Sequence, residues 1–163
     1  MQLTIRDAGD LKRLSRALGQ VAGGKELKRE LSRGFRDVLK PYVPIVRAAY
    51  RSAPGRGSAS RRGGSLRALL ARSVRVEVRL TGRTAGARIR ADGRRMPDQM
   101  KAIPRYWEGI GQWRHPVFGD RERWVAQQGH PTFYRTLRSS EAAAGRQVEQ
   151  VVRRVVKKAE RAS

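Results

Sequence analysis

Two histidines, a few serines and a scattered set of carboxylates are the residues of this 163-residue chain that could do chemistry. His115 and His130 stand near Asp120 and Glu122 in the sequence, and the four could be considered together as metal ligands. Each histidine directly precedes a proline, and their spacing is not the i, i+4 interval that places a zinc-binding pair on one helix face. We therefore expect structural or surface roles for both, and a small metal enzyme stays only as a third hypothesis.

Other forms of catalysis find little support in the residue pattern. Ser65 and Ser73 have no His–Asp pair close by in the sequence, and the Gly-x-Ser-x-Gly nucleophile motif is absent. The chain has no cysteine, which excludes disulfides, thiolate metal sites and a thiol nucleophile. A P-loop and a Rossmann fingerprint are also missing, and the 14 carboxylates form no cluster. We therefore expect a protein that is not an enzyme and that uses no cofactor or metal.

Charge is the strongest compositional signal. The chain holds 37 Lys and Arg against 14 Asp and Glu, which gives a formal net charge of +23. Lys and Arg release counterions when they neutralise phosphates, so the charge favours a nucleic-acid partner. The same charge could steer and pair acidic protein partners, and an excess of arginine over lysine can follow from a GC-rich genome. The charge alone therefore leaves both classes of partner open.

Large aromatic residues gather in one part of the chain. The set comprises Trp107, Trp113, Phe118, Trp124 and Phe133. Such residues could stack on the bases of single-stranded nucleic acid. More often they are core residues or anchors of a subunit interface, where tryptophan is enriched. We favour this second interpretation for the whole set.

The elements that must position these residues begin with helices. Apolar residues at helical spacing predict a first helix over residues 11–21. A second apolar stripe runs through residues 25–50 in steps of three and four. Because Pro41 and Pro44 lie inside this stripe, the helix must kink or restart near Lys40.

A loop follows that is rich in glycine, serine and arginine. Residues 51–65 contain almost nothing to bury, so we expect a flexible loop in the isolated protein. Its four arginines are candidate contacts to a partner or to DNA: Arg51, Arg56, Arg61 and Arg62.

The pattern then changes to strict alternation. Residues 74–80 and 85–91 alternate apolar and charged side chains around a Thr-Gly-Arg-Thr turn, which predicts a β-hairpin with one apolar and one arginine-rich face. Arg75, Arg88 and Arg90 lie on the second face and are further candidate contacts.

The remaining segments complete a mixed fold. Short helices are expected at 66–71 and around 98–102, and Gly and Pro residues predict a turn-rich stretch with one or two short strands over 105–119. Valines on one face predict a last helix over 140–162, packed on the small sheet or on another subunit. We expect a single α+β domain over residues 1–163: a long kinked N-terminal helix, a small sheet based on an antiparallel hairpin, and a C-terminal helix packed on one face.

Neither a membrane span nor a secretory signal is expected. No stretch approaches 18 uninterrupted apolar residues, and the first ten residues contain no apolar segment behind a basic start. The pattern is typical of an intracellular protein without contact to a membrane.

The linear order of short motifs resembles a known protein family. In chain order these motifs are Ser52-Ala53-Pro54, Gly64-Ser65-Leu66-Arg67, Ser73-Val74, Tyr106-Trp107-Glu108-Gly109, Arg114-His115-Pro116-Val117-Phe118-Gly119, Trp124-Val125 and Pro131-Thr132-Phe133, followed by the basic last helix. The order covers about residues 25–160 and resembles the tail-component family of tailed bacteriophages, the small neck proteins also called head–tail joining or tail-completion proteins. The loop over 55–63 is longer and richer in glycine than the compact form typical of that family.

This resemblance implies a non-enzymatic virion protein. Copies of the chain would form a ring, expected to be a hexamer, at the head–tail junction, and DNA would pass through its lumen. The implied partners are further copies of the chain, the head connector or adaptor, and the tail terminator or tail-tube proteins. The implied location is the neck of the virion, after assembly in the host cytoplasm. A stand-alone basic nucleic-acid-binding protein is the alternative, supported by the net charge and the basic hairpin face.

Overall fold

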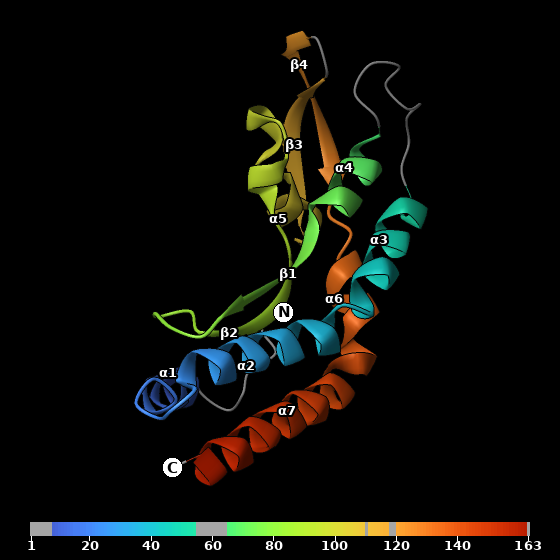
Figure 1. The fold of residues 1–163 in the computed structure, drawn as a ribbon. Coiled ribbons are helices and arrows are strands. Elements are labelled where there is room, and N and C mark those ends of the chain that lie inside the picture. Colours follow the sequence, from blue (N-terminus) through green and yellow to red (C-terminus); the bar gives the residue numbers. More distant parts are fainter. Residues whose placement is uncertain (1–7, 55–64, 110, 118–119, 163) are drawn as a thin grey trace. The chain divides into compact units, whose positions relative to one another are not determined.

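The structure is a computed structural model (Figure 1), and the residues that it describes are 8–54, 65–109, 111–117 and 120–162. The chain groups into two compact units, and each unit combines segments that are far apart in the sequence. Unit 1 comprises residues 1–44, 75–90 and 138–163, and unit 2 comprises residues 45–74 and 91–137.

Unit 1 is built around two long helices. Its elements are α1 (Ala8–Ala17), α2 (Gly24–Leu39), most of the hairpin strands β1 (Val74–Arg79) and β2 (Gly86–Ala91), the 3-10 turn η3 (Arg138–Ser140) and α7 (Glu141–Ala162). Helices α2 and α7 lie side by side (Figure 1). The apolar stripe of each helix is buried, and the buried residues are Leu27, Leu31, Phe35 and Leu39 on α2, and Ala144, Val148, Val151 and Val155 on α7.

The turn between α1 and α2 requires two glycines. Gly23 adopts a φ of 70°, a left-handed conformation that glycine adopts without steric cost. A Cβ atom at Gly24 would overlap the carbonyl oxygen of Leu18. The first helix ends at Ala17, a few residues before the predicted end at residue 21.

The predicted kink is confirmed. Helix α2 ends at Leu39 and α3 (Tyr42–Ser52) begins after Lys40 and Pro41. Pro41 has no N–H to donate, so the helical hydrogen-bond ladder is interrupted there. Pro44 falls in the first turn of α3, where a backbone N–H has no partner inside the helix.

Unit 2 combines short helices with a second two-stranded sheet. It contains the rest of α3, then α4 (Leu66–Ser73), the 3-10 turns η1 (Gly93–Arg95) and η2 (Asp98–Met100), α5 (Ile103–Trp107), β3 (Gln112–Val117), β4 (Asp120–Gln128) and α6 (Thr132–Leu137). Its buried side chains include Tyr50, Leu70, Trp107, Phe133 and Leu137.

The sheet of unit 2 is antiparallel and irregular at its turn end. Its register runs from Gln112 opposite Gln128 to Pro116 opposite Trp124, and it shifts between Pro116 and Val117. The expected strands in the turn-rich stretch thus correspond to β3, whereas the partner strand β4 was not predicted. The reason lies in the exposure of β4, whose side chains from residue 122 to 126 are all exposed and show no apolar alternation.

The α+β fold class is confirmed, with the hairpin β1–β2 and the long C-terminal helix at the predicted positions. The predicted start of loop 51–65 is wrong, whereas its predicted end agrees with the start of α4 at Leu66. Arg51 and Ser52 belong to α3, and the hydroxyl of Ser65 caps α4 by accepting a hydrogen bond from the N–H of Ala68. In the described part of the chain, no helix has the length and apolar character that a bilayer crossing would need.

Candidate functional site

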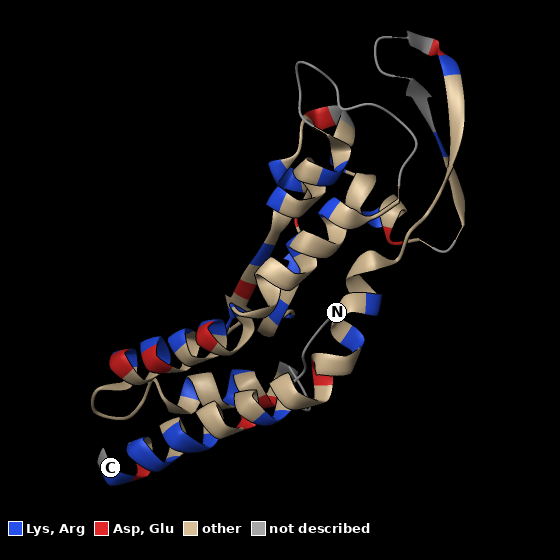
Figure 2. Cartoon of the chain, turned by 90° about the vertical axis from the view of Figure 1, so that its right-hand side faces the viewer, with Lys and Arg blue, Asp and Glu red and all other residues tan. Residues whose placement is uncertain are grey.

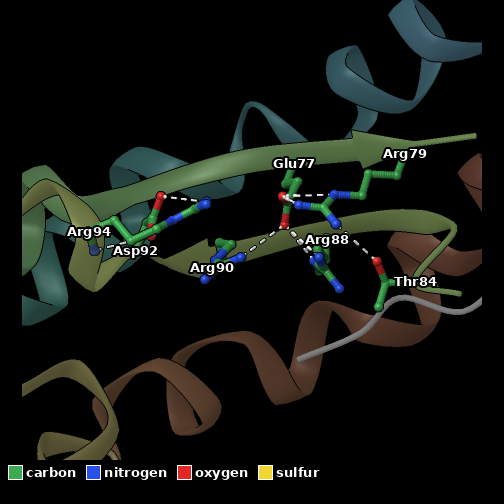
Figure 3. Close-up of polar contacts among 7 residues, drawn as sticks. All are labelled: Glu77, Arg79, Thr84, Arg88, Arg90, Asp92 and Arg94. Atoms are coloured by element: carbon green, nitrogen blue, oxygen red, sulfur yellow. Dashed lines mark hydrogen bonds and ion pairs between the residues drawn. The ribbon is translucent and has the colours of Figure 1, made fainter. Parts of the chain in front are cut away.

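The arginine-rich face of hairpin β1–β2 is organised around one carboxylate (Figure 3). Glu77 lies on β1 and contacts Arg88 and Arg90 on β2, with distances of 2.7 Å to Arg88 Nη2 and 3.3 Å to Arg90 Nη1. Arg79, on the same strand as Glu77, contacts the other carboxylate oxygen at 2.8 Å and donates a second hydrogen bond to the hydroxyl of Thr84. We call Glu77, Arg79, Arg88 and Arg90 the hairpin arginine cluster.

The electrostatics of this cluster keep Glu77 ionised. Burial alone would raise the pKa of Glu77, whose side chain is 11% exposed. Hydrogen bonds from Arg88 and Arg90 and the attraction of nearby guanidinium charges outweigh burial and lower the pKa of Glu77 to about 2. At neutral pH the cluster therefore carries one negative charge on Glu77 and three positive charges on its arginines.

Replacement of Glu77 by glutamine is expected to destabilise unit 1 by about 1 kcal/mol, because three arginines lose the anion that they share. The loss stays this small because the arginines are partly exposed, and solvent weakens each ion pair. A carboxyl whose pKa is lowered on folding stabilises the folded state above its unfolded pKa, so the difference between wild type and E77Q should shrink as the pH falls from 4.5 towards 2. Urea unfolding at several pH values measures this difference.

The matched control is Glu26→Gln on α2. Glu26 pairs with Arg29 at 3.7 Å, and both side chains are at least 70% exposed, so this variant should stay within about 0.5 kcal/mol of wild type. Equal effects of E26Q and E77Q would contradict a specific role of Glu77.

The other predicted contact arginines are spread over both units. Arg75 is half-buried on β1, and Arg51 is exposed in the last turn of α3. Arg56, Arg61 and Arg62 lie outside the described residues. The structure thus brings Arg88 and Arg90 together with Arg79, which was not among the predicted contacts.

Two further arginines of unit 2 bind backbone carbonyls. Arg47 donates to the carbonyl oxygen of Val74 at 2.9 Å, and Arg67 donates to that of Ala53 at 2.9 Å. Both hydrogen bonds link segments that are distant in the sequence. These charges hold the unit together, and nothing in the local sequence pattern separates them from arginines that are available to a partner.

The aromatic set divides between core and surface. Trp107, Trp113 and Phe133 are buried, in agreement with the core interpretation. Trp124, on β4, is 51% exposed, so it is not a core residue of this unit. Phe118 lies outside the described residues. Trp107 donates from its indole N–H to the hydroxyl of Thr132 at 3.2 Å, which ties α5 to the start of α6.

Glu108 is a central residue of unit 2, and the sequence pattern indicates no role for it. Its carboxylate accepts a hydrogen bond from the hydroxyl of Tyr50 at 2.8 Å and one from the backbone N–H of Phe133 at 3.1 Å. The second bond caps the N-terminus of α6, where free N–H groups favour a negative charge. Burial raises the pKa of Glu108 above its ordinary value, although these hydrogen bonds oppose the rise. Burial and the neighbouring Glu108 also raise the pKa of Tyr50.

The outer surface of unit 2 carries several large apolar side chains. Trp124 and Val125 on β4 are 51% and 36% exposed, and Tyr106 and Tyr134 are about half exposed. Tyr106 stacks on Trp113, with 5.5 Å between ring centroids. The neighbours Trp124 and Val125 point to opposite faces of β4, so both faces of this strand present apolar surface.

The described residues contain no group of three or more His, Asp or Glu side chains that could hold a metal ion. His130 packs against the ring of Trp107, with 5.4 Å between centroids. The side chains of His115 and Asp120 lie outside the description.

Basic residues also line α7, most densely towards its C-terminal end (Figure 2). Acidic residues of the neighbouring helix offset part of this charge, because Glu30 on α2 pairs with Lys158 at 2.7 Å. This partly exposed pair between α2 and α7 contributes little to stability in water. The positive charge of unit 1 is therefore spread over its helices and the hairpin arginine cluster.

The chain matches no protein-family model, no curated protein sequence and no solved structure.

Proposed function

We propose that this chain is a structural subunit that assembles with copies of itself into a ring, and that the ring joins the head connector of a tailed bacteriophage to its tail tube around the DNA. The order of motifs over about residues 25–160, which resembles the tail-component family, supports the phage assignment. The subunits of a closed ring contact one another through a heterologous interface, in which two different surfaces of the subunit meet.

The observation that carries the assembly part of the proposal is the exposure of strand β4. A two-stranded sheet is only marginally stable in water by itself, and an open edge strand is a template for pairing with another chain. Trp124 and Val125 sit on this strand and are exposed, and tryptophan is a frequent energetic centre of protein interfaces. A neighbouring subunit that covered β4 would bury both side chains and complete the sheet.

The double variant Trp124→Ser/Val125→Ser is expected to weaken assembly by at least about tenfold in the concentration required, because it removes the largest exposed apolar contacts of β4. Mass photometry over a concentration series measures the oligomers of wild type and variant, alone and with connector and tail-tube proteins.

Tyr134→Ser is the matched control. Tyr134 lies on α6, outside the sheet, and is 53% exposed, so its replacement should leave assembly unchanged. The proposal fails if wild type stays monomeric and binds neither partner, or if the β4 double variant assembles as well as wild type.

The second candidate function is a stand-alone nucleic-acid-binding protein, and the net charge of +23 favours it. It requires tight binding to DNA or RNA by a protein that does not assemble, with a steep loss of affinity as salt rises. Weak binding of the monomer at physiological salt would exclude it.

A further inference from the structure

The hairpin arginine cluster has a surplus of positive charge at a fixed place. Glu77 contributes one negative charge against the three guanidinium groups of Arg79, Arg88 and Arg90. Three guanidinium groups have more N–H donors than the one carboxylate that they share can accept. The shared carboxylate holds the arginines together without neutralising them.

The layering of the cluster places the positive charges outermost. The Glu77 side chain is 11% exposed, whereas the side chains of Arg88, Arg90 and Arg79 are 21%, 35% and 46% exposed. Figure 3 shows the arginine side chains from both strands converging on the glutamate. An approaching anion therefore finds more accessible surface on the arginines than on the carboxylate.

The cluster is also preorganised. Arg88 contacts Glu77 through both Nε and Nη2, and Arg79 is held by Glu77 and by Thr84. An arginine that is already fixed loses less side-chain entropy when it binds a ligand than a free surface arginine does. Guanidinium groups recognise phosphate oxygens through paired hydrogen bonds.

We propose that Arg79, Arg88 and Arg90, held by Glu77, form a binding site for the phosphodiester backbone of DNA. The site reads charge and geometry, so it does not distinguish DNA sequences. The inference rests on the proposed ring function, because that function brings a DNA duplex to the site through the lumen of the ring. The site itself requires only the folded hairpin.

The experiment measures the affinity of the full chain for a fluorescent duplex of about 25 base pairs between about 50 and 200 mM salt. The double variant Arg88→Ala/Arg90→Ala should lose about tenfold or more in affinity, and the slope of log affinity against log salt should fall by about 2, since two phosphate contacts disappear. Arg88→Lys/Arg90→Lys should keep most of the slope but lose about threefold to tenfold in affinity, because lysine cannot make paired hydrogen bonds to phosphate.

The matched control removes the same charge elsewhere. Arg153 and Lys157 are exposed on α7, and Arg153→Ala/Lys157→Ala should reduce affinity by less than about threefold. Equal losses in the hairpin and control variants would overturn the proposal, because binding would then follow total charge. A polyglutamate peptide that binds wild type as tightly as the duplex, with the same losses, would overturn it in favour of an acidic protein partner.

Loss of Arg88 and Arg90 leaves Glu77 without its principal partners, which could unfold the hairpin. The triple variant Glu77→Gln/Arg88→Gln/Arg90→Gln removes the orphaned charge as well, and circular dichroism checks its fold. A folded triple variant that binds the duplex with wild-type affinity would overturn the proposal. Mass photometry of each variant separates the two proposals, because a ring that forms without a hairpin effect on DNA contradicts only the site, and a monomer that binds DNA through the hairpin contradicts only the ring.

Discussion

Replacement of Glu108 by alanine is expected to lower the free energy of unfolding by about 2–4 kcal/mol. The carboxylate is the common acceptor of the Tyr50 hydroxyl and the Phe133 N–H, and both donors would lose a hydrogen bond in a buried region. A buried donor without an acceptor costs about 1–3 kcal/mol. Urea unfolding followed by tryptophan fluorescence suits the measurement, because Trp107 is buried in the same unit.

Glu108→Gln is the informative comparison. Glutamine keeps a carbonyl oxygen for one donor and has no charge to bury, so this variant should lie within about 1 kcal/mol of wild type.

Since the pKa of Glu108 is raised on folding, the contribution of this residue to the free energy of unfolding is fully present below pH 4.5 and declines as the pH rises through the folded pKa. Wild type should therefore gain stability relative to E108Q on acidification. A difference that does not change between pH 7 and pH 4 contradicts the raised pKa, and an alanine variant as stable as wild type contradicts the hydrogen-bonding role.

Replacement of Gly34 by alanine is expected to cost about 2 kcal/mol of stability in unit 1. In an exposed helix this substitution normally stabilises by up to about 1 kcal/mol. Here a Cβ atom would lie 2.5 Å from Cγ1 of Val151, because α2 and α7 approach closely at this glycine. Valine has one strongly preferred rotamer in a helix, so its side chain cannot turn away without strain. The change in Tm measured by circular dichroism tests the sign.

Val151→Ala provides the rescue. Without the two γ-carbons, the closest remaining side-chain atom of residue 151 is Cβ at 3.4 Å, an ordinary contact. The single variant V151A should lose about 1–2 kcal/mol through the cavity it leaves, and the double variant G34A/V151A should be no less stable than V151A. Additive losses in the double variant would show that the two residues do not meet.

The elements with a buried face were accessible from the sequence. Hairpin strand β2 buries Ala87 and Ile89 between half-buried Arg88 and Arg90, and this alternation is visible in the sequence. Helices α2 and α7 likewise bury one stripe each, and the helical period gives that stripe its spacing of three and four residues in the sequence. Strand β4 was missed because both of its faces are exposed, so no burial pattern marks it.

The residues of the candidate sites were only partly accessible. The sequence placed Arg88 and Arg90 on one face of the hairpin, and Glu77 stood in the same alternation as the signal for a shared counter-ion. The partnership of Glu108 with Tyr50 and Phe133 joins three distant segments and leaves no local pattern. Composition also could not tell which arginines bind backbone carbonyls in the folded chain.

The pairing of α2 with α7 bears on how the protein is made. The two helices stand near opposite ends of the chain, so during translation α2 emerges on the order of ten seconds before the helix that covers it. Throughout that interval Leu31 and Phe35 have no α7 to bury them. The core of unit 1 can therefore close only after release of α7 from the ribosome. Until then these apolar side chains stay uncovered, and premature contact between unfinished copies is a hazard of synthesis.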